Sequence, residues 1–184
     1  MAFPDKKYAI IYADPPWAYE NWNNKWHEKH SESRWVGRKY PLMSVEDICA
    51  LPVKDIAADN SLLFMWTIST MIPAALKVIE SWGFSYRTMA FVWIKKNLKS
   101  DSFFTGMGFY TRSNSEICLL AKRGKTLKRI DKGVRQIVCT PRGRHSEKPA
   151  EVRDRIVQLM GDLPRIELFA RERIDGWDAW GNEI

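Results

Sequence analysis

The residues best suited to chemistry are Asp14-Pro15-Pro16-Trp17, which directly follow the apolar run 8–13. That run is rich in strand-forming residues and ends abruptly at the prolines, so it predicts a buried strand with an acid at its carboxyl end. An amino group on an aromatic base is a poor nucleophile, because its lone pair is delocalised into the ring. The Asp14 carboxylate and the Pro15 carbonyl could accept both amino hydrogens and turn the lone pair toward an electrophilic methyl group. Consecutive prolines restrict φ, so both acceptors would be held in place beforehand.

Trp17 could offer an aromatic face on which a base taken out of its stack would rest. The alternative is structural: the prolines stiffen a strand exit, Asp14 caps a neighbouring group and Trp17 belongs to the core. The order of acid, two prolines and aromatic residue is more specific than a pair of prolines, and it favours the catalytic interpretation.

Positive charge is concentrated in one segment of the chain. The formal net charge of the whole chain is +7. Residues 122–148 hold ten lysines and arginines against Asp131 and Glu147, which gives this segment +8 and leaves −1 for the rest. Such a stripe is typical of a surface that binds a polyanion, and a solvated face is the alternative.

An alternation of strands and helices must position these residues. Besides 8–13, apolar runs predict strands at 61–67, 86–94, 116–121, 134–139 and 165–169. Cap residues and helical spacing predict helices that begin near Ser44 and Pro149, and a third over 73–82. The result is a doubly wound α/β sandwich, whose ligands bind at the carboxyl ends of the strands. The segment 17–40 has no periodicity and is expected to be a binding loop or lid, and 95–110 is a second long, basic loop.

Composition favours one compact cytosolic domain over residues 1–184. This length, with 45% apolar residues, suffices for one core. No run is long enough to cross a membrane and no signal-peptide pattern opens the chain, so no membrane partner is expected. Cys49, Cys118 and Cys139 lie far apart and are expected to be buried thiols. Neither they nor the three histidines have the spacing of a metal site, so no metal is expected.

Several motifs follow one another along nearly the whole chain: Tyr12-Ala-Asp-Pro-Pro-Trp17, Tyr40-Pro-Leu-Met-Ser44, Leu63-Phe-Met-Trp66, Glu116-Ile-Cys118, His145-Ser-Glu-Lys-Pro149, Glu167-Leu-Phe-Ala-Arg171 and Gly181-Asn-Glu183. Together they resemble the adenine-N(6) methyltransferases related to the catalytic subunit of the eukaryotic messenger-RNA methyltransferase, a family with small bacterial and phage members. The resemblance implies a Rossmann-like S-adenosylmethionine-dependent methyltransferase fold in permuted order. The catalytic strand would come first and the cofactor strand last.

The resemblance also assigns residues to roles. The segment Asp14-Pro15-Pro16-Trp17 matches the catalytic motif. Four further residues match those that the family uses on S-adenosyl-L-methionine: Lys148, Arg171 after the last strand, and the polar pair Asn182 and Glu183. A zwitterionic donor with a carboxylate and a vicinal diol needs such cations and polar acceptors.

Residues near the two long loops are expected to contact the substrate: Tyr40, Tyr110, Glu116, Arg142 and Arg144. Tyr40 and Tyr110 are candidates for the base or its flank, and the two arginines could bridge the nucleic-acid and donor sites. The remaining tryptophans are expected in the core: Trp66, Trp82, Trp93, Trp177 and Trp180.

The sequence therefore predicts an enzyme that methylates the exocyclic amino group of adenine in nucleic acid, with DNA favoured over RNA as substrate. The alternative from another class is a non-catalytic nucleic-acid-binding subunit, against which the intact Asp14-Pro15-Pro16-Trp17 argues. Activity as a homodimer or with a partner chain is a third possibility, because the chain is small.

Overall fold

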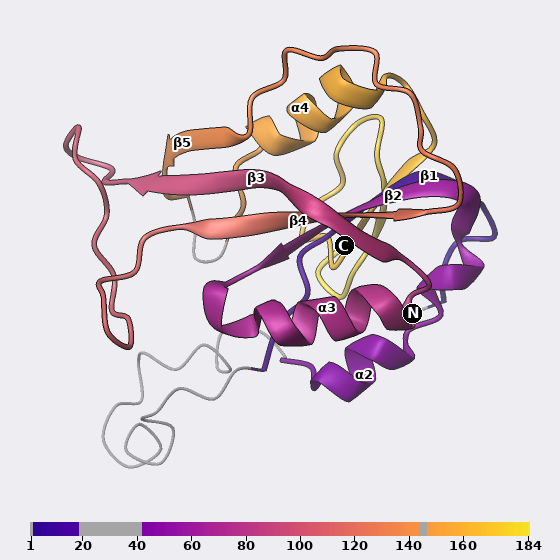
Figure 1. Cartoon of the computed structure of the whole chain (residues 1–184), viewed down its shortest axis with the longest axis horizontal. Coiled ribbons are helices and arrows are strands. Elements are labelled where there is room, and N and C mark those ends of the chain that lie inside the picture. The colour runs from indigo at the N-terminus through magenta and orange to yellow at the C-terminus, as the bar shows by residue number, and fades with distance from the viewer. Residues whose placement is uncertain (1, 19–41, 144–146) are drawn as a thin grey trace.

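The computed structural model of the chain describes residues 2–18, 42–143 and 147–184. These residues form a seven-stranded sheet with the strand order β5-β3-β4-β2-β1-β6-β7 (Figure 1). The strands are β1 (Tyr8–Ala13), β2 (Ala57–Thr67), β3 (Ser85–Lys96), β4 (Glu116–Arg123), β5 (Ile137–Pro141), β6 (Arg165–Leu168) and β7 (Asp178–Trp180). The helices are α2 (Val45–Ala50), α3 (Ile72–Ser81) and α4 (Glu151–Met160), with 3₁₀ turns η2 (Val53–Asp55) and η3 (Ser69–Met71).

The direction of the strands gives the sheet one functional edge. β1 is parallel to β2 and β6, β6 is parallel to β7, and β3 is parallel to β5. β4 is antiparallel to both β2 and β3, so among the described strands it alone runs the other way. The carboxyl ends of the other strands therefore meet at one edge, the left-hand edge in Figure 1.

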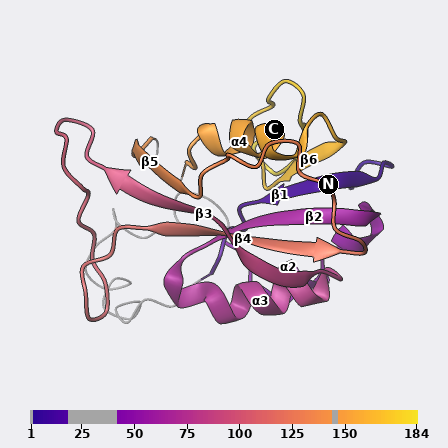
Figure 2. The ribbon, with the colours of Figure 1, turned by 45° about the horizontal axis from the view of Figure 1, so that its top comes forward.

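Helices cover both faces of the sheet, as expected for a doubly wound sandwich. Figure 2 shows α2 and α3 on one side and α4 on the other. Along β1, Ile11 and Ala13 pack in the cluster that α3 covers, while Ile10 and Tyr12 pack in the cluster that α4 covers. A central strand buried on both faces must be apolar at every position, which is why 8–13 reads as a continuous run.

Most of the elements predicted from the sequence are confirmed, including the first strand and the helix near 73–82. The cap near Ser44 is confirmed too, since its Oγ accepts a hydrogen bond from the backbone N–H of Asp47 at 3.0 Å. The predicted start of the strand 134–139 was wrong, because pairing with β3 begins only at Ile137. The short strand β7 was not predicted, and it follows the expected cofactor strand β6.

The expected burial of the cysteines holds only in part. Cys118 is buried, Cys49 is half-buried and Cys139 is exposed, and all three are free thiols. Cys139 lies on the edge strand β5 next to Val138, which takes the inward position, so the alternation of side chains turns Cys139 outward. All five tryptophans expected in the core are at most 9% exposed. No helix among the described residues is long and apolar enough to cross a membrane.

Candidate active site

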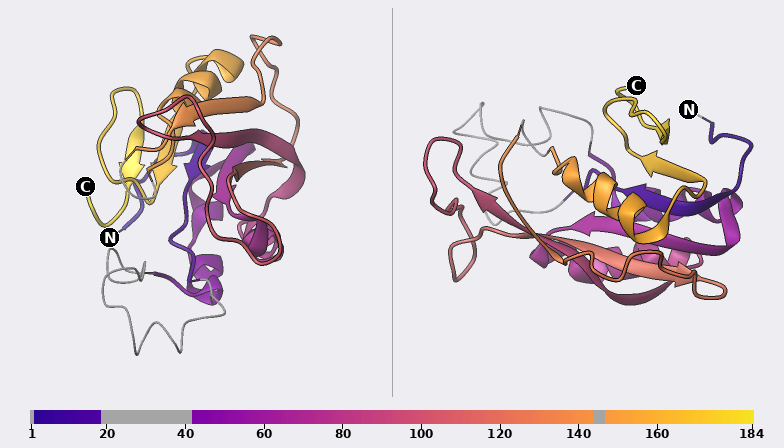
Figure 3. Two further views of the ribbon diagram at one scale, coloured as in Figure 1. Left: turned by 90° about the vertical axis from the view of Figure 1, so that its left-hand side faces the viewer. Right: turned by 90° about the horizontal axis from the view of Figure 1, so that it is seen from above.

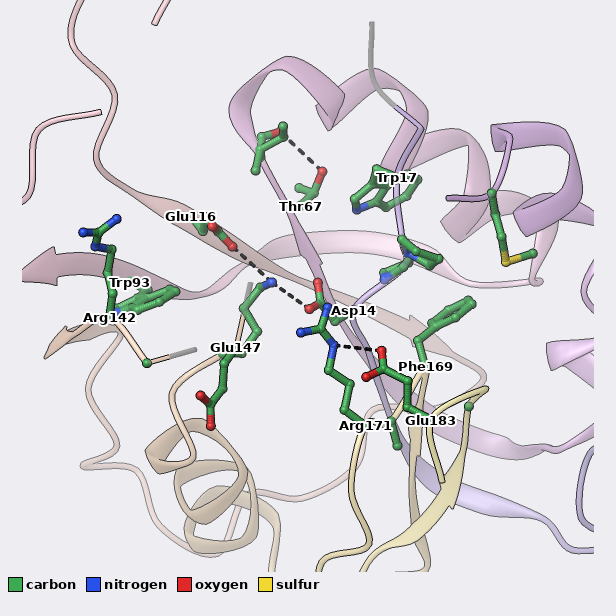
Figure 4. Close-up of a pocket in the computed structure, with 18 of the residues that line it drawn as sticks. Asp14, Trp17, Thr67, Trp93, Glu116, Arg142, Glu147, Phe169, Arg171 and Glu183 are labelled. Carbon is green, nitrogen blue, oxygen red and sulfur yellow. Dashed lines mark hydrogen bonds and ion pairs between the residues drawn. The ribbon is translucent and has the colours of Figure 1, made fainter. Parts of the chain in front are cut away.

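A pocket of about 350 Å³ opens at the carboxyl edge of the sheet (Figure 4). The segments that follow β1, β2, β5, β6 and β7 line it, together with the end of β3 and the start of β4. These segments contribute Asp14, Pro15, Pro16, Trp17, Met43, Thr67, Ile68, Trp93, Lys95, Phe104, Glu116, Arg142, Gly143, Glu147, Lys148, Phe169, Ala170, Arg171, Trp180, Gly181, Asn182 and Glu183. The pocket therefore depends on the topology of the sheet rather than on any one stretch of sequence.

The Asp14–Trp17 turn is fixed by hydrogen bonds on both sides. The Pro15 carbonyl accepts a bond from the Trp17 backbone N–H at 2.9 Å, and the Pro16 carbonyl accepts one from Met43 at 2.9 Å. The Trp17 Nε1 donates to the carbonyl oxygen of Trp66 at 3.2 Å, and its side chain is nearly buried. Trp17 is thus anchored to β2, and it forms part of the pocket wall.

Trp66, on β2, supports this turn. Its buried Nε1 donates a hydrogen bond to the Tyr12 hydroxyl at 2.6 Å, two residues before Asp14. The Lys148 Nζ lies 5.9 Å from the centre of the Trp66 ring. Trp66 therefore contacts the strand, the turn and the lysine, and we infer that it positions all three.

We expect Trp66→Phe to lower the free energy of unfolding by roughly 1–3 kcal/mol, because it removes the donor from a buried Tyr12 hydroxyl. Turnover should fall as well, since the turn that carries Asp14 loses support. Trp82→Phe is the matched control: it removes a bond from Nε1 to the Ile48 carbonyl at 2.8 Å, away from the pocket. Chemical denaturation and turnover of both variants check this. Equal turnover in the two variants would contradict a positioning role for Trp66.

Four side chains of alternating charge cross the pocket floor. The Lys148 Nζ lies 2.6 Å from an Asp14 carboxylate oxygen and 3.2 Å from Glu116. The other Glu116 oxygen lies 2.5 Å from the Lys95 Nζ. Lys148 thus lies between the two carboxylates, Asp14 and Glu116, which Figure 4 labels. All four groups are partly buried, so these pairs are less screened by solvent than surface pairs.

The charges shift one another's ionisation. Burial raises the pKa of Asp14, and the adjacent Lys148 opposes that shift. Burial acts against ionised Glu116 as well, but Lys148 and Lys95 prevail and hold its pKa below the usual range. Burial disfavours charged Lys148, yet Asp14 and Glu116 raise its pKa above that of an ordinary lysine. Lys148 therefore stays protonated, while Asp14 is a stronger base than an exposed aspartate.

The neighbouring wall follows β6 and β7, since β6 pairs directly with β1. The Arg171 Nε lies 3.4 Å from a Glu183 oxygen. A side chain at Gly181 would place its Cβ 2.2 Å from the Ala170 carbonyl oxygen, so the two segments touch through backbone alone. Phe169 adopts a left-handed conformation with φ of 61°, which turns the chain sharply after β6. This close packing brings Asn182 and Glu183 beside Arg171.

Most of the predicted site residues line this one pocket: the catalytic and donor candidates, with Glu116 and Arg142. Tyr110 is not among them, since it is fully exposed on the connection between β3 and β4. Tyr40 and Arg144 lie outside the described residues. Among the residues that the structure describes, no cluster of His, Cys, Asp and Glu could hold a metal ion.

Sequence reasoning did not assign twelve of the lining residues to the site, among them Trp93, Lys95 and Phe104. Lys95 directly follows the predicted strand 86–94, and the carboxyl end of a strand is the signal that could have identified it. Phe104 stacks under Arg142, whose guanidinium carbon lies 3.6 Å from the ring centre. Nothing in the local sequence indicates that contact.

The basic stripe is not gathered at the pocket. Lys122 and Arg123 end β4 at the opposite edge of the sheet, where the Arg123 guanidinium donates to the Lys54 carbonyl at 2.8 Å. Only its last members, Arg142 and Lys148, reach the pocket within the described part of the chain.

The chain is similar to known methyltransferases along nearly its whole length. The MT-A70 family model matches residues 8–183. The type II methyltransferase M.MunI of a Mycoplasma species is 40% identical over 98% of this chain and 79% of its own length. The N(6)-adenosine-methyltransferase MT-A70-like protein of Drosophila melanogaster is 27% identical, and the human N(6)-adenosine-methyltransferase catalytic subunit METTL3 is 25% identical. Each match covers 97% of this chain but only 27% and 28%, respectively, of those longer proteins. The chain therefore belongs to the MT-A70 family of adenine methyltransferases.

Proposed function

We propose that the chain transfers a methyl group from S-adenosylmethionine to the exocyclic amino group of adenine in DNA. The observation that carries this proposal is the Asp14 carboxylate, held 2.6 Å from Lys148 at the end of β1, in the same pocket as Arg171, Asn182 and Glu183. One wall supplies acceptors for an amino group, and the neighbouring wall supplies polar groups for a donor.

The catalytic wall suits an aromatic amine. Asp14 can accept one amino hydrogen, and the Pro15 carbonyl can accept the other through the lone pair that the Trp17 N–H does not use. The nitrogen that gains a methyl group becomes cationic and must lose a proton. The raised pKa of Asp14 makes it a suitable acceptor for that proton.

The neighbouring wall, together with Lys148 on the pocket floor, fits the donor by its chemistry. Arg171 and Lys148 are cations for its carboxylate, and Asn182 and Glu183 are hydrogen-bonding partners for its ribose hydroxyls. When bound, S-adenosylmethionine supplies an electrophilic methyl group. The role of the chain is to hold that donor and the base in one pocket with little room for water.

DNA is proposed ahead of RNA because M.MunI, at 40% identity, is named as a type II methyltransferase, the term for the modifying enzyme of DNA restriction systems. RNA is the second candidate, because more distant relatives are named N(6)-adenosine-methyltransferases. A non-catalytic nucleic-acid-binding subunit is disfavoured by the intact and hydrogen-bonded Asp14-Pro15-Pro16-Trp17 turn.

The experiment is to incubate the protein with labelled S-adenosylmethionine and with single-stranded or duplex DNA or RNA of mixed sequence. The modified nucleoside is then identified by mass spectrometry and its sequence position is mapped. N(6)-methyldeoxyadenosine, absent from a parallel reaction with Asp14→Ala, supports the proposal. Label in RNA alone would identify RNA as the substrate, and label in neither nucleic acid would overturn the proposal.

Arg142 is proposed to hold a phosphate of the substrate. Its guanidinium carbon lies 3.6 Å from the centre of the Phe104 ring, and its buried Nε makes no hydrogen bond to any described residue. A planar cation fixed in this way at a pocket rim suits a phosphate.

Arg142→Ala should therefore make the slope of log binding constant against log salt concentration shallower by roughly 0.7–0.9. This is the contribution expected from about one phosphate contact. Affinity should fall alike for all sequences. Lys128→Ala is the control, because Lys128 is an exposed member of the basic stripe that does not line the pocket. Binding titrations at several salt concentrations check this. A wild-type slope in Arg142→Ala would place the phosphate contact elsewhere.

A further inference from the structure

The connection between β3 and β4, residues 97–115, carries an unusual set of exposed apolar side chains. Half of the exposed large hydrophobic residues in the described part of the chain lie here: Leu98, Phe103, Met107, Phe109 and Tyr110. Tyr110 is fully exposed and Met107 is 81% exposed. Figures 1 and 3 show this connection reaching out beyond the carboxyl edge of the sheet. Solvent-exposed aromatic residues gathered on one projection are typical of a binding surface.

Hydrogen bonds hold the connection 97–115 in this exposed conformation. The Asn114 side-chain amide donates to the Lys95 carbonyl at 2.9 Å and to the Phe104 carbonyl at 2.6 Å, and its oxygen accepts from the Lys95 N–H. Further out, the Gly106 N–H donates to the Ser113 carbonyl at 2.7 Å. A Cβ at Gly108 would lie 2.1 Å from the Thr111 carbonyl oxygen, so the turn is tight. These bonds hold residues 97–115 as a projection from the sheet, with Phe109 and Tyr110 at its end.

The root of this projection is a wall of the pocket. Phe104 lines the pocket and stacks under Arg142, and Lys95 binds Glu116 on the pocket floor. The tip residues 107–110 therefore extend from the same wall that faces Asp14. A duplex that brings an adenine to Asp14 would meet the tip beside that adenine.

We propose that the tip residues 107–110, chiefly Phe109 and Tyr110, insert into duplex DNA at the target base pair and fill the gap that the flipped adenine leaves. This rests on the proposed function. An adenine inside a duplex cannot reach a pocket floor, and taking it out costs a few kcal/mol of unstacking and unpairing. Apolar side chains inserted between base steps offset that cost in other proteins that deform DNA.

The charge of the projection favours DNA over a second copy of the chain as its partner. The projection, residues 97–115, holds Lys99 and Arg112 against Asp101, a net charge of +1, and Lys95 and Lys96 at its root are two further cations. Phosphates beside the inserted tip would meet this charge favourably. Two such projections brought together in a homodimer would repel each other.

The test compares the wild type with Phe109→Ala/Tyr110→Ala on three substrates that contain the mapped target sequence. These are the duplex, the same strand alone, and the duplex with an abasic site opposite the target adenine. Met89→Ala is the control, because it removes an exposed apolar side chain from the body of β3, outside the projection. We expect the double variant to methylate the intact duplex roughly tenfold or more slowly. Its rates on the strand alone and on the duplex with the abasic site should stay within about twofold of the wild-type rates, because the target adenine is already unpaired in both.

Binding is followed separately with 2-aminopurine in place of the target adenine. Its fluorescence should rise when the wild type binds the duplex, and the rise should be smaller with the double variant. Equal loss on all three substrates, or no loss on any, would overturn insertion. A wild-type dimer that becomes a monomer in the double variant on sedimentation would assign the tip to an interface between copies instead. A wild type that methylates none of the DNA substrates would overturn the proposed function, while the fluorescence arm still reports on insertion.

Discussion

Replacing Asp14 with alanine is expected to lower turnover by on the order of a hundredfold or more and to leave donor affinity nearly unchanged. The carboxylate accepts an amino hydrogen chiefly as the lone pair turns toward the methyl group, so its loss is felt in the transition state. The variant should still fold, because Lys148 keeps Glu116 as a partner at 3.2 Å. Steady-state turnover and calorimetric titration of S-adenosylmethionine measure the two effects.

Asp14→Asn is the matched control for size. It keeps one acceptor oxygen but loses the charge that pairs with Lys148, so we expect turnover between those of wild type and Asp14→Ala. Near-normal turnover in Asp14→Ala would show that the carboxylate is structural. An equal loss of donor affinity would move Asp14 into the donor site.

The second large effect is expected at Lys148. Lys148→Ala should weaken S-adenosylmethionine binding by roughly 1–3 kcal/mol, through loss of hydrogen bonds to a charged ligand. It should also change the pH dependence of turnover. Asp14 must be ionised to offer a charged acceptor and to take the proton that the methylated nitrogen loses, so turnover is lost as the pH falls through its pKa. Burial raises that pKa and Lys148 opposes the rise. Removing the lysine should therefore move the acid limb of the pH–turnover profile, where turnover falls with falling pH, to higher pH.

Asn182→Ala separates the two consequences. Asn182 is proposed to bind the donor but is not among the groups that shift the pKa of Asp14. We therefore expect weaker donor binding with the acid limb unchanged. Calorimetry and turnover between about pH 5 and 9, at saturating donor, test both variants. An unmoved acid limb in Lys148→Ala would contradict the coupling with Asp14, and unchanged affinity in both variants would place the donor elsewhere.

Much of the catalytic wall could be predicted from local sequence. The run 8–13 is apolar at every position because the strand is buried on both faces, and the prolines mark its end. These two signals place Asp14 at the carboxyl edge without any knowledge of the other strands. The donor residues were predicted by resemblance, because Lys148, Arg171 and Asn182 lie in separate segments that only the completed sheet brings together.

What could not be predicted depends on long-range register. Lys95 reaches Glu116 because β3 pairs antiparallel with β4, with Trp93 opposite Glu116, and no local pattern fixes that pairing. The basic stripe was a poor guide to the residues of the pocket for the same reason. Its members are neighbours in sequence, but Lys122 lies at one edge of the sheet and Arg142 at the other. Tyr110 ends a tight turn whose direction depends on the hydrogen bonds of Asn114.

The place of β1 in the sheet also affects how the molecule is made. β1 pairs with β2 on one side and with β6 on the other, and the Lys148 that pairs with Asp14 is 134 residues away in sequence. Such distant pairings form slowly, because long loops must close before any contact offsets their entropy. Until β6 leaves the ribosome, β1 has an open, apolar edge that can pair with other chains. The strand that leads to Asp14 is thus an aggregation-prone part of the nascent chain, and donor binding should return only with the last step of refolding.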